Sequence, residues 1–175
     1  NPYSAGFIAA DQWANTVACS FSMNGLFGEG RMVPESGIIA AGPYSSGSVN
    51  LTPVVVGNEK TGDLRFAASA SGGLAAPAAL IQSMLRAYGD EEGGLNAAIS
   101  APRVTHVGRP DITWVESAVP QNVRSALLAK GHNVKETAVI GSVVALYCED
   151  GALQGNETCE IVADKRAFGL GLRVQ

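Results

Sequence analysis

The N-terminal part of the chain alternates between apolar runs and a polar turn. An apolar run over residues 7–11 is followed by the polar segment Gln12–Asn15, and then by small and apolar residues from Thr16 to Asn24. This pattern predicts two strands joined by a short turn. Neither strand shows clean polar alternation, so we expect both faces of the hairpin to be covered.

The rest of the chain predicts further hairpins and helices. Apolar runs over residues 51–57 and 64–70 flank a polar turn and predict a second hairpin in the same sheet. Apolar residues then recur at helical spacing from Leu74 to Tyr88, the strongest helix of the chain. Shorter segments predict helices at 95–100 and 120–130, and strands at 38–41, 112–116, 132–136, 140–148 and 160–163. We expect one α/β domain, α+β by strand direction, with a largely antiparallel sheet in αββα layers.

Polar side chains gather at one end of the first predicted hairpin. Ser4 precedes its first strand, and Ser22 and Asn24 lie at the exit of the second. An antiparallel hairpin brings these positions together, and a hydroxyl beside a second hydroxyl and an amide is a candidate nucleophile with its activators. The alternative is that the three side chains satisfy backbone groups at the strand ends.

A glycine pair joins the second hairpin to the long helix. Gly72 and Gly73 follow Ser71 directly and precede the helix at Leu74. Helix N-termini present free N–H groups, and glycine lets a ligand approach closely, so this turn is a candidate oxyanion hole. The alternative is a tight strand-to-helix turn that binds no ligand.

Composition narrows the class of partner. The chain has 175 residues, of which 46% are hydrophobic and 16% charged, and its net charge is −4. It contains no cluster of Lys and Arg, so we expect no nucleic-acid partner. It has no apolar run of about 18 residues, so we expect no membrane span in this chain, and the N-terminus shows no signal-peptide pattern. Few charges fit a large buried fraction or an interface with another chain.

The three cysteines bear on redox state and metals. Cys19 lies inside a predicted strand, whereas Cys148 and Cys159 flank a loop that they could staple. An odd number of cysteines without a dense framework favours reduced thiols and a cytoplasmic location, with the periplasm as the alternative. Neither a CxxC motif nor a histidine pair is present, so we expect no metal site and no cofactor. Asp164 and Arg166 are interpreted as a surface or interface ion pair without a chemical role.

Short motifs rich in Ser, Gly and Asn follow one another from Ser4 to about Asp164: Ser4-x-x-Phe7, Asp11, Asn15, Ser22-x-Asn24, Phe27-Gly28-x-Gly30, Ser36-Gly37-Ile38, Thr52-Pro53, Ser71-Gly72-Gly73, Ala101-Pro102-Arg103, Gly131-His132-x-Val134 and Gly141-Ser142. In order and spacing this set resembles the small subunit of the gamma-glutamyltranspeptidase family. No single motif carries the resemblance.

The resemblance implies the N-terminal-nucleophile hydrolase sandwich and a proenzyme that cuts itself. Ser4 stands where the family usually has its threonine nucleophile, which attacks an amide carbonyl with its own α-amine as base. Ser22 and Asn24 would support it, and Gly72 with Gly73 would form the oxyanion hole. The partners implied are a large subunit from the same precursor and a small-molecule amide. We also consider a dimer of such heterodimers.

The predicted substrate pocket departs from the family pattern. After Gly37 the family usually carries a segment whose aspartate holds the α-amine of a glutamyl group, but this chain has Ala40–Pro43. The family's Ser-Ser pair, which helps to hold the α-carboxylate, is replaced by Val49 and Asn50, and we assign substrate binding to Asn50. A site without these partners should discriminate against glutamyl donors. We therefore expect another amide as substrate, with a catalytically silent binding or structural subunit as the alternative.

The start of the chain is the second departure. Asn1, Pro2 and Tyr3 precede Ser4, whose nitrogen is therefore in a peptide bond in the printed sequence. Three explanations stay open at this point: a fragment boundary unrelated to processing, cleavage elsewhere in a catalytically silent chain, or a cut upstream followed by trimming.

Overall fold

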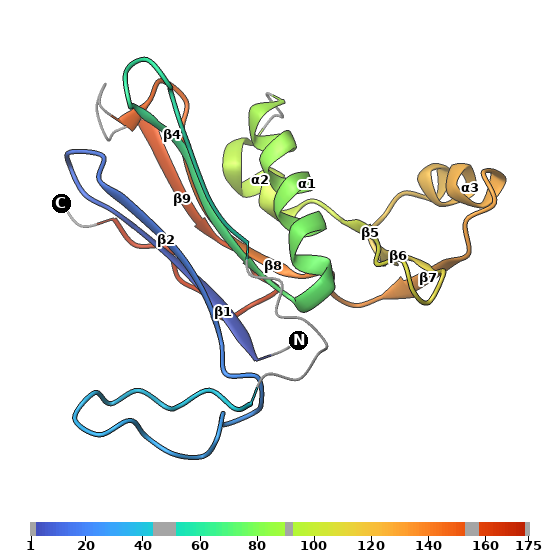
Figure 1. Cartoon of the computed structure of the whole chain (residues 1–175). Coiled ribbons are helices and arrows are strands. Elements are labelled where there is room, and N and C mark those ends of the chain that lie inside the picture. The colour runs from blue at the N-terminus through green and yellow to red at the C-terminus, as the bar shows by residue number, and fades with distance from the viewer. Residues whose placement is uncertain (1–2, 44–51, 90–92, 153–157, 174–175) are drawn as a thin grey trace.

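The computed structural model describes residues 3–43, 52–89, 93–152 and 158–173. Its main body has three layers (Figure 1). A two-stranded hairpin of β1 (Ser4–Ala10) and β2 (Thr16–Ser22) lies against one face of a four-stranded sheet. Helices α1 (Ala76–Tyr88) and α2 (Gly94–Ser100) cover the other face. The arrangement confirms an α+β class with stacked sheets.

The four-stranded sheet is antiparallel throughout. Its strand order is β3-β4-β8-β9, with bounds Thr52–Gly57, Leu64–Ser71, Ser142–Cys148 and Cys159–Ala163. The predicted second hairpin is therefore real, but its placement in the same sheet as the first hairpin was wrong. Two apolar runs joined by a turn predict only that neighbouring strands pair. They do not predict which strands of different hairpins pair, and here the two hairpins stack face to face.

Strand β4 is buried on both faces because it lies between the two other layers. Phe66, Ala68 and Ala70 pack with α1 and α2 in one apolar cluster. Ala67, which faces the opposite way, packs in a second cluster with Ile8 of the hairpin. Alternate residues of one strand thus serve two cores, which explains its continuous apolar sequence.

The remaining elements form a small unit beside the main body (Figure 1). Strands β5 (Val104–His106), β6 (Thr113–Glu116) and β7 (Val134–Thr137) make a three-stranded sheet in that order. Strand β7 pairs parallel with β6, and helix α3 (Gln121–Ala129) makes the crossover between them. The edge position predicted for residues 132–136 is confirmed, whereas β5 was not predicted because three residues are too few to show a period.

Two other expectations are corrected. The strand expected at residues 38–41 is only an isolated bridge between Met32 and Ile39. Cys148 and Cys159 form a disulfide that links β8 to β9, with the Cα atoms 4.1 Å apart, so the reduced-thiol prediction was wrong for this pair. Cys19 is a free, half-buried thiol on β2. The number of cysteines favoured reduced thiols, but it carries no information on pairing. Cys148 and Cys159 are opposite each other on the paired strands β8 and β9.

The hairpin leaves one face uncovered within the described chain. Phe7, Val17 and Phe21 are about half exposed, and the Phe7 and Phe21 ring centroids are 6.3 Å apart. An arm over residues 24–43 extends from the same hairpin and exposes further apolar side chains, Leu26, Phe27, Met32 and Ile38 among them (Figure 1). The expectation that both faces are covered thus holds for one face only in this chain.

Candidate active site

The register of the first hairpin places the predicted nucleophile beside its predicted activator. Ser4 and Ser22 are directly opposite each other at the open end of the β1–β2 ladder. The ladder continues one step further, because the Met23 N–H donates to the Tyr3 carbonyl at 3.0 Å. The carbonyl of the Tyr3–Ser4 peptide bond is thereby held in a fixed orientation next to the Ser4 side chain.

Small residues let the hairpin approach the sheet closely at this end. The Ser20 and Ser69 hydroxyls are 2.5 Å apart across the two layers. A β-carbon at Gly6 would lie 2.7 Å from the Ser69 β-carbon, so no larger residue fits there without movement. Gly6 and Ser20 are paired in the hairpin, and both therefore lie above Ser69.

The same stacking continues along both strands. Ile8 packs in the cluster that contains Ala67, two residues before Ser69 on β4. The two-residue period of strands then places Ser4 and Ser22 above Ser71 in the other direction. Ser71 is the last residue of β4, so from this period we expect the predicted nucleophile to lie near the start of the glycine turn.

The turn after Ser71 has a backbone conformation that depends on its two glycines. Gly72 and Gly73 have φ values of 126° and 62°, which glycine adopts readily and other residues do not. They lead into the 3-10 turn η1 (Gly73–Ala75) and then α1, and the first N–H groups of a helix have no acceptor within it. Across the turn, the Ser71 and Ser142 hydroxyls are hydrogen-bonded at 2.8 Å. Neither serine received a role from the sequence, although both lie in the motifs.

Asn24 is at the hairpin end but turns to a different neighbour. Its backbone takes a left-handed φ of 58°, and its N–H donates to the Ser22 hydroxyl at 3.0 Å. Its side-chain Nδ2 donates to the Gly42 carbonyl at 3.0 Å, and the Gly42 N–H donates to the Met23 carbonyl at 2.8 Å. Gly42, in the segment where the resemblance would place a glutamyl-binding residue, is therefore bound to the hairpin end.

The structure thus brings five of the six predicted site residues to two facing segments. Ser4, Ser22 and Asn24 come from the hairpin end, and Gly72 and Gly73 come from the turn beneath it. Asn50 lies outside the described residues. Asp11 and Asn15, which belong to the same motif set, are at the far turn of the hairpin, where the Asn15 Nδ2 donates to the Asp11 carboxylate at 2.8 Å. The roles of the six residues remain predictions.

A buried cluster of four charges lies behind the glycine turn. Arg103 is paired with Asp164 at 2.8 Å, and both side chains are almost fully buried. Arg166 binds Glu116 at 2.6 Å and Asp164 at 3.1 Å. The predicted pairing of Asp164 with Arg166 is confirmed, but its position on the surface was wrong, because the Arg166 side chain is only 14% exposed. Its partner Glu116 is distant in sequence, so local composition could not reveal the burial.

Burial and these contacts shift the pKa values of Glu116, Arg103 and Arg166. Burial acts to raise the pKa of Glu116, but hydrogen bonds from Arg166, Ile140 and Arg103 outweigh it and hold this pKa below its ordinary value of 4.5. Burial lowers the pKa of Arg103, opposed by the attraction of Asp164. Burial also acts on Arg166, yet its bonds to Glu116 and Asp164 raise its pKa overall. The hydrogen bonds between Arg166 and Glu116 therefore favour the charged form of both groups.

Glu116→Gln is expected to destabilise the protein most at neutral pH. Removing one partner of a buried ion pair costs about 3 kcal/mol. Because the folded pKa of Glu116 is lowered, its contribution is complete above pH 4.5 and is lost as the pH falls through the folded pKa. The difference in thermal unfolding midpoint between wild type and variant should narrow below pH 4.5.

Glu136→Gln is the control, because Glu136 forms an exposed ion pair with Arg124. Its replacement should lower the free energy of unfolding by less than about 1 kcal/mol. A difference in unfolding midpoint between wild type and Glu116→Gln that widens in acid would contradict the stabilising role assigned to the Glu116 carboxylate.

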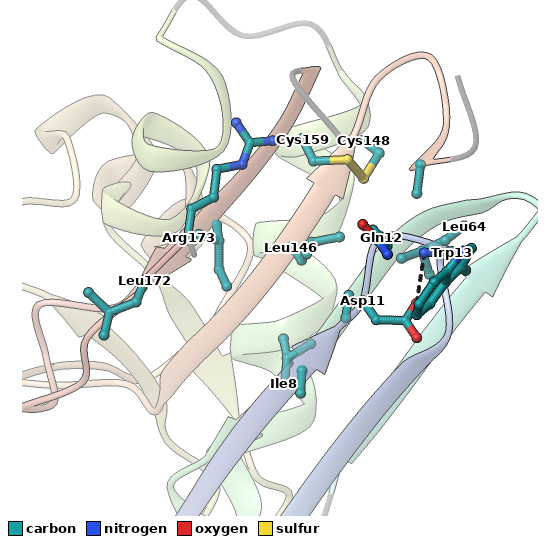
Figure 2. A pocket seen from close by; sticks show the side chains of 14 residues that line it. Ile8, Asp11, Gln12, Trp13, Leu64, Leu146, Cys148, Cys159, Leu172 and Arg173 are labelled. Atoms are coloured by element: carbon teal, nitrogen blue, oxygen red, sulfur yellow. Dashed lines mark hydrogen bonds between the residues drawn. A yellow bond between two sulfur atoms is a disulfide. The ribbon is translucent and has the colours of Figure 1, made fainter. Parts of the chain in front are cut away.

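A separate cavity lies at the β1–β2 turn, which is the opposite end of the hairpin from Ser4. Figure 2 shows this cavity from close by. It measures about 820 Å³ and is lined by the β1–β2 turn, β8, β9 and the C-terminal segment. Ile8 and Leu146 lie along its wall, and the Cys148–Cys159 disulfide borders it. Because Ile8 and Ser4 are four residues apart on one strand, this cavity does not contain the candidate nucleophile.

Two negative findings apply to the described ranges. No helix there is long and apolar enough to cross a membrane. Within the same ranges no three His, Cys, Asp or Glu side chains come together in a way that could hold a metal ion.

Comparison with known proteins decides the family. The model of the gamma-glutamyltranspeptidase family matches residues 40–169. The chain belongs to the gamma-glutamyltranspeptidase family. That match starts after the first hairpin and covers most of the rest of the chain.

Two curated relatives of the family align with most of the chain. The acylase ACY 1 proenzyme of Pseudomonas sp. (strain V22) is 30% identical over 162 residues, which is 83% of this chain. The glutathione hydrolase proenzyme of Bacillus subtilis subsp. natto is 29% identical over 169 residues, or 85% of this chain. The chain spans only 28% of the length of each. Family members of both kinds are therefore equally similar to it.

Two solved structures confirm the fold. The gamma-glutamyltranspeptidase of Pseudomonas nitroreducens superposes with a TM-score of 0.73 at 20% sequence identity, over 97% of this chain and 99% of that chain. The transpeptidase enzyme CapD of Bacillus anthracis superposes with a TM-score of 0.75 at 20% sequence identity. The superposition covers 98% of this chain and 99% of that chain. The expected gamma-glutamyltranspeptidase-type N-terminal-nucleophile fold is thus confirmed for nearly the whole chain, including the hairpin.

Proposed function

We propose that this chain is the nucleophile-bearing part of an amide-cleaving hydrolase or acyltransferase, with Ser4 as nucleophile. One observation carries the proposal: the hairpin register sets Ser4 opposite Ser22, at the end of the hairpin that is held against β4 by the Ser20–Ser69 contact. Strand β4 ends at Ser71, directly before Gly72 and Gly73. Attack by the Ser4 hydroxyl on a substrate amide carbonyl forms an acyl-enzyme and releases the amine. The N–H groups at Gly72 and Gly73 stabilise the oxyanion, and water or a second amine then takes the acyl group.

The α-amine of Ser4 has to be free to act as the base. We propose that the precursor frees it by self-cleavage at Tyr3–Ser4. The Ser4 hydroxyl attacks the Tyr3 carbonyl, the peptide C–N bond breaks, and water hydrolyses the resulting ester to a Tyr3 carboxylate and a free Ser4 amine. The Met23 N–H, at 3.0 Å from the Tyr3 oxygen, supports this step because it polarises that carbonyl. The names of the two curated relatives, both proenzymes, agree with processing.

A large subunit from the same precursor is the proposed partner. The uncovered apolar face of the hairpin and the apolar arm over residues 24–43 need a cover that the described chain does not supply. The chain spans only 28% of the length of each of its two curated relatives, which leaves a large part of that length to supply such a cover. We propose that this part completes both the fold and the substrate pocket.

The proposed acyl group is not a γ-glutamyl group. A glutamyl donor carries an α-amine and an α-carboxylate, which need charged or polar partners. The side chains gathered at the site, namely Ser4, Ser22, Asn24, Ser71 and Ser142, are uncharged, and the Asn24 amide is bound to Gly42. The acylase relative supports a different amide, whereas the glutathione hydrolase relative supports the glutamyl alternative.

A matched pair of anilides tests the substrate. The processed enzyme is assayed with γ-glutamyl-4-nitroanilide and with the same anilide lacking only the α-amino group. We expect kcat/KM to favour the desamino substrate by at least about 10-fold, because an unpaired buried ammonium costs affinity. A preference for the glutamyl anilide would overturn the proposed substrate class but not the nucleophile. Absence of turnover with a wider amide panel would favour the catalytically silent alternative.

A further inference from the structure

Buried charged side chains bind four backbone groups of residues 140–143. Arg103 Nη1 donates to the Ile140 and Gly141 carbonyls, each at 3.2 Å. The Ile140 N–H donates to the Glu116 carboxylate at 2.8 Å. The Val143 N–H donates to the Asp164 carboxylate at 3.1 Å. We call this segment the brace.

Arg103 is the central group of this arrangement. Its second terminal nitrogen donates to the Ser83 hydroxyl at 3.1 Å and the Ile99 carbonyl at 2.9 Å, and it pairs with Asp164 at 2.8 Å. Its side chain is fully buried, and its Nε has no hydrogen-bond partner among the described residues. A buried ion pair is weak evidence for stability, since apolar replacements are often as stable. We therefore attribute to Arg103 a role in fixing the geometry of the backbone that it binds, rather than in stability.

The brace directly contacts the glycine turn. A β-carbon on Gly72 would lie 2.6 Å from the Gly141 Cα, so the two backbones touch. Gly141 itself has a φ of 61°, and a β-carbon there would lie 3.0 Å from the Ser71 carbonyl oxygen. The Ser142 hydroxyl bonds to the Ser71 hydroxyl at 2.8 Å. Any shift of the brace therefore moves the turn that precedes α1.

We propose that Arg103 is a positioning residue for catalysis, which holds Gly141 against Gly72 so that the N–H groups of the glycine turn point at the reacting carbonyl. This inference rests on the proposed function, since it assigns the glycine turn to the oxyanion. Arg103 touches no substrate. Its planar guanidinium binds three carbonyls, a hydroxyl and a carboxylate at once, which the single ammonium of lysine cannot reproduce.

Arg103→Lys in the full-length protein tests the proposal, with Arg86→Lys as matched control. Arg86 is also at the α1 side of the core, but it donates to the Pro102 carbonyl at 3.1 Å and does not bind the brace. We expect Arg103→Lys to lower kcat about 30-fold with KM within about threefold, since a displacement of about 1 Å can cost 10²-fold. Arg86→Lys should leave both constants within about twofold.

Hydrogen exchange supplies a readout that does not depend on activity. Arg103→Lys should accelerate exchange at the amides of residues 72–75 and 140–143 at least about 10-fold, with the amides of β3 and β4 unchanged. Arg86→Lys should not. If the wild type cleaves no amide, the proposed function fails, and exchange alone still decides whether Arg103 orders the turn.

The proposal is overturned if Arg103→Lys folds and keeps kcat within twofold, if it raises KM alone, or if Arg86→Lys has the same effect. Where Arg103→Lys does not fold, Ser83→Ala replaces it. This variant removes one bond to Arg103 and leaves the charges in place. A fall in kcat of about threefold with faster exchange at residues 72–75 supports the proposal, and unchanged values refute it.

Discussion

Ser4→Ala is expected to abolish amide cleavage, with a fall in kcat of about 10³-fold or more, because no other group can form the acyl-enzyme. The precursor should also remain uncut, since the same hydroxyl attacks the Tyr3 carbonyl. Both effects are measured on the purified full-length protein, by turnover of the best amide of the panel and by gel electrophoresis.

Two variants make the Ser4 result interpretable. Ser4→Thr keeps a hydroxyl and should retain processing and turnover within about 10-fold, because only a methyl group is added. Ser20→Ala removes a neighbouring hydroxyl that bonds to Ser69 and should lower kcat by less than about fivefold. Full activity in the alanine variant at position 4 would refute the assignment of the nucleophile.

Gly72→Ala is expected to lower kcat by about 10²-fold to 10³-fold, which is the usual cost of disturbing an oxyanion hole. The new methyl group would lie 2.6 Å from the Gly141 Cα, and the φ of 126° is unfavourable for alanine. The turn has to move, and its N–H groups then miss the oxyanion. KM should change much less, because the turn acts mainly in the transition state.

Gly62→Ala separates backbone strain from the specific contact. Gly62 also has a positive φ, of 71°, but a β-carbon there meets nothing within 4 Å. Its replacement should destabilise the protein by about 1 kcal/mol through strain alone and leave kcat unchanged. Comparable losses of kcat in the two variants would show that the effect at Gly72 is global destabilisation.

Local patterns in the sequence predicted most of the elements. Hairpin geometry alone placed Ser4 beside Ser22, and the helical period predicted α1, whose start at the glycine turn followed from Gly72 and Gly73. These predictions succeeded because each depends on neighbours along the chain. Only the resemblance linked the hairpin end with the glycine turn, because no local pattern relates these two segments.

Contacts between distant segments could not be predicted in the same way. The stacking of the two hairpins depends on Gly6 and Ser69, whose small size leaves no periodic signal. Arg166 stands in a polar turn and looked exposed, yet Glu116 on β6 buries it. Arg103 lay in a quoted motif but received no role, although an arginine between the apolar residues Ile99 and Val104 was a signal that could have been used.

The close approach at Gly6 has a consequence for sequence tolerance. Ser69 already fills the space of a side chain at position 6, so even alanine would separate the two layers. Position 5 is different, because Ala5 is exposed on the outer face of the hairpin. In a library of random substitutions selected for activity, position 6 should admit glycine alone, although it lies two residues from Ser4. The absence of a β-carbon at position 6 therefore sets how closely the hairpin and the four-stranded sheet approach each other. It thereby also sets the spacing that we expect between the nucleophile and the glycine turn.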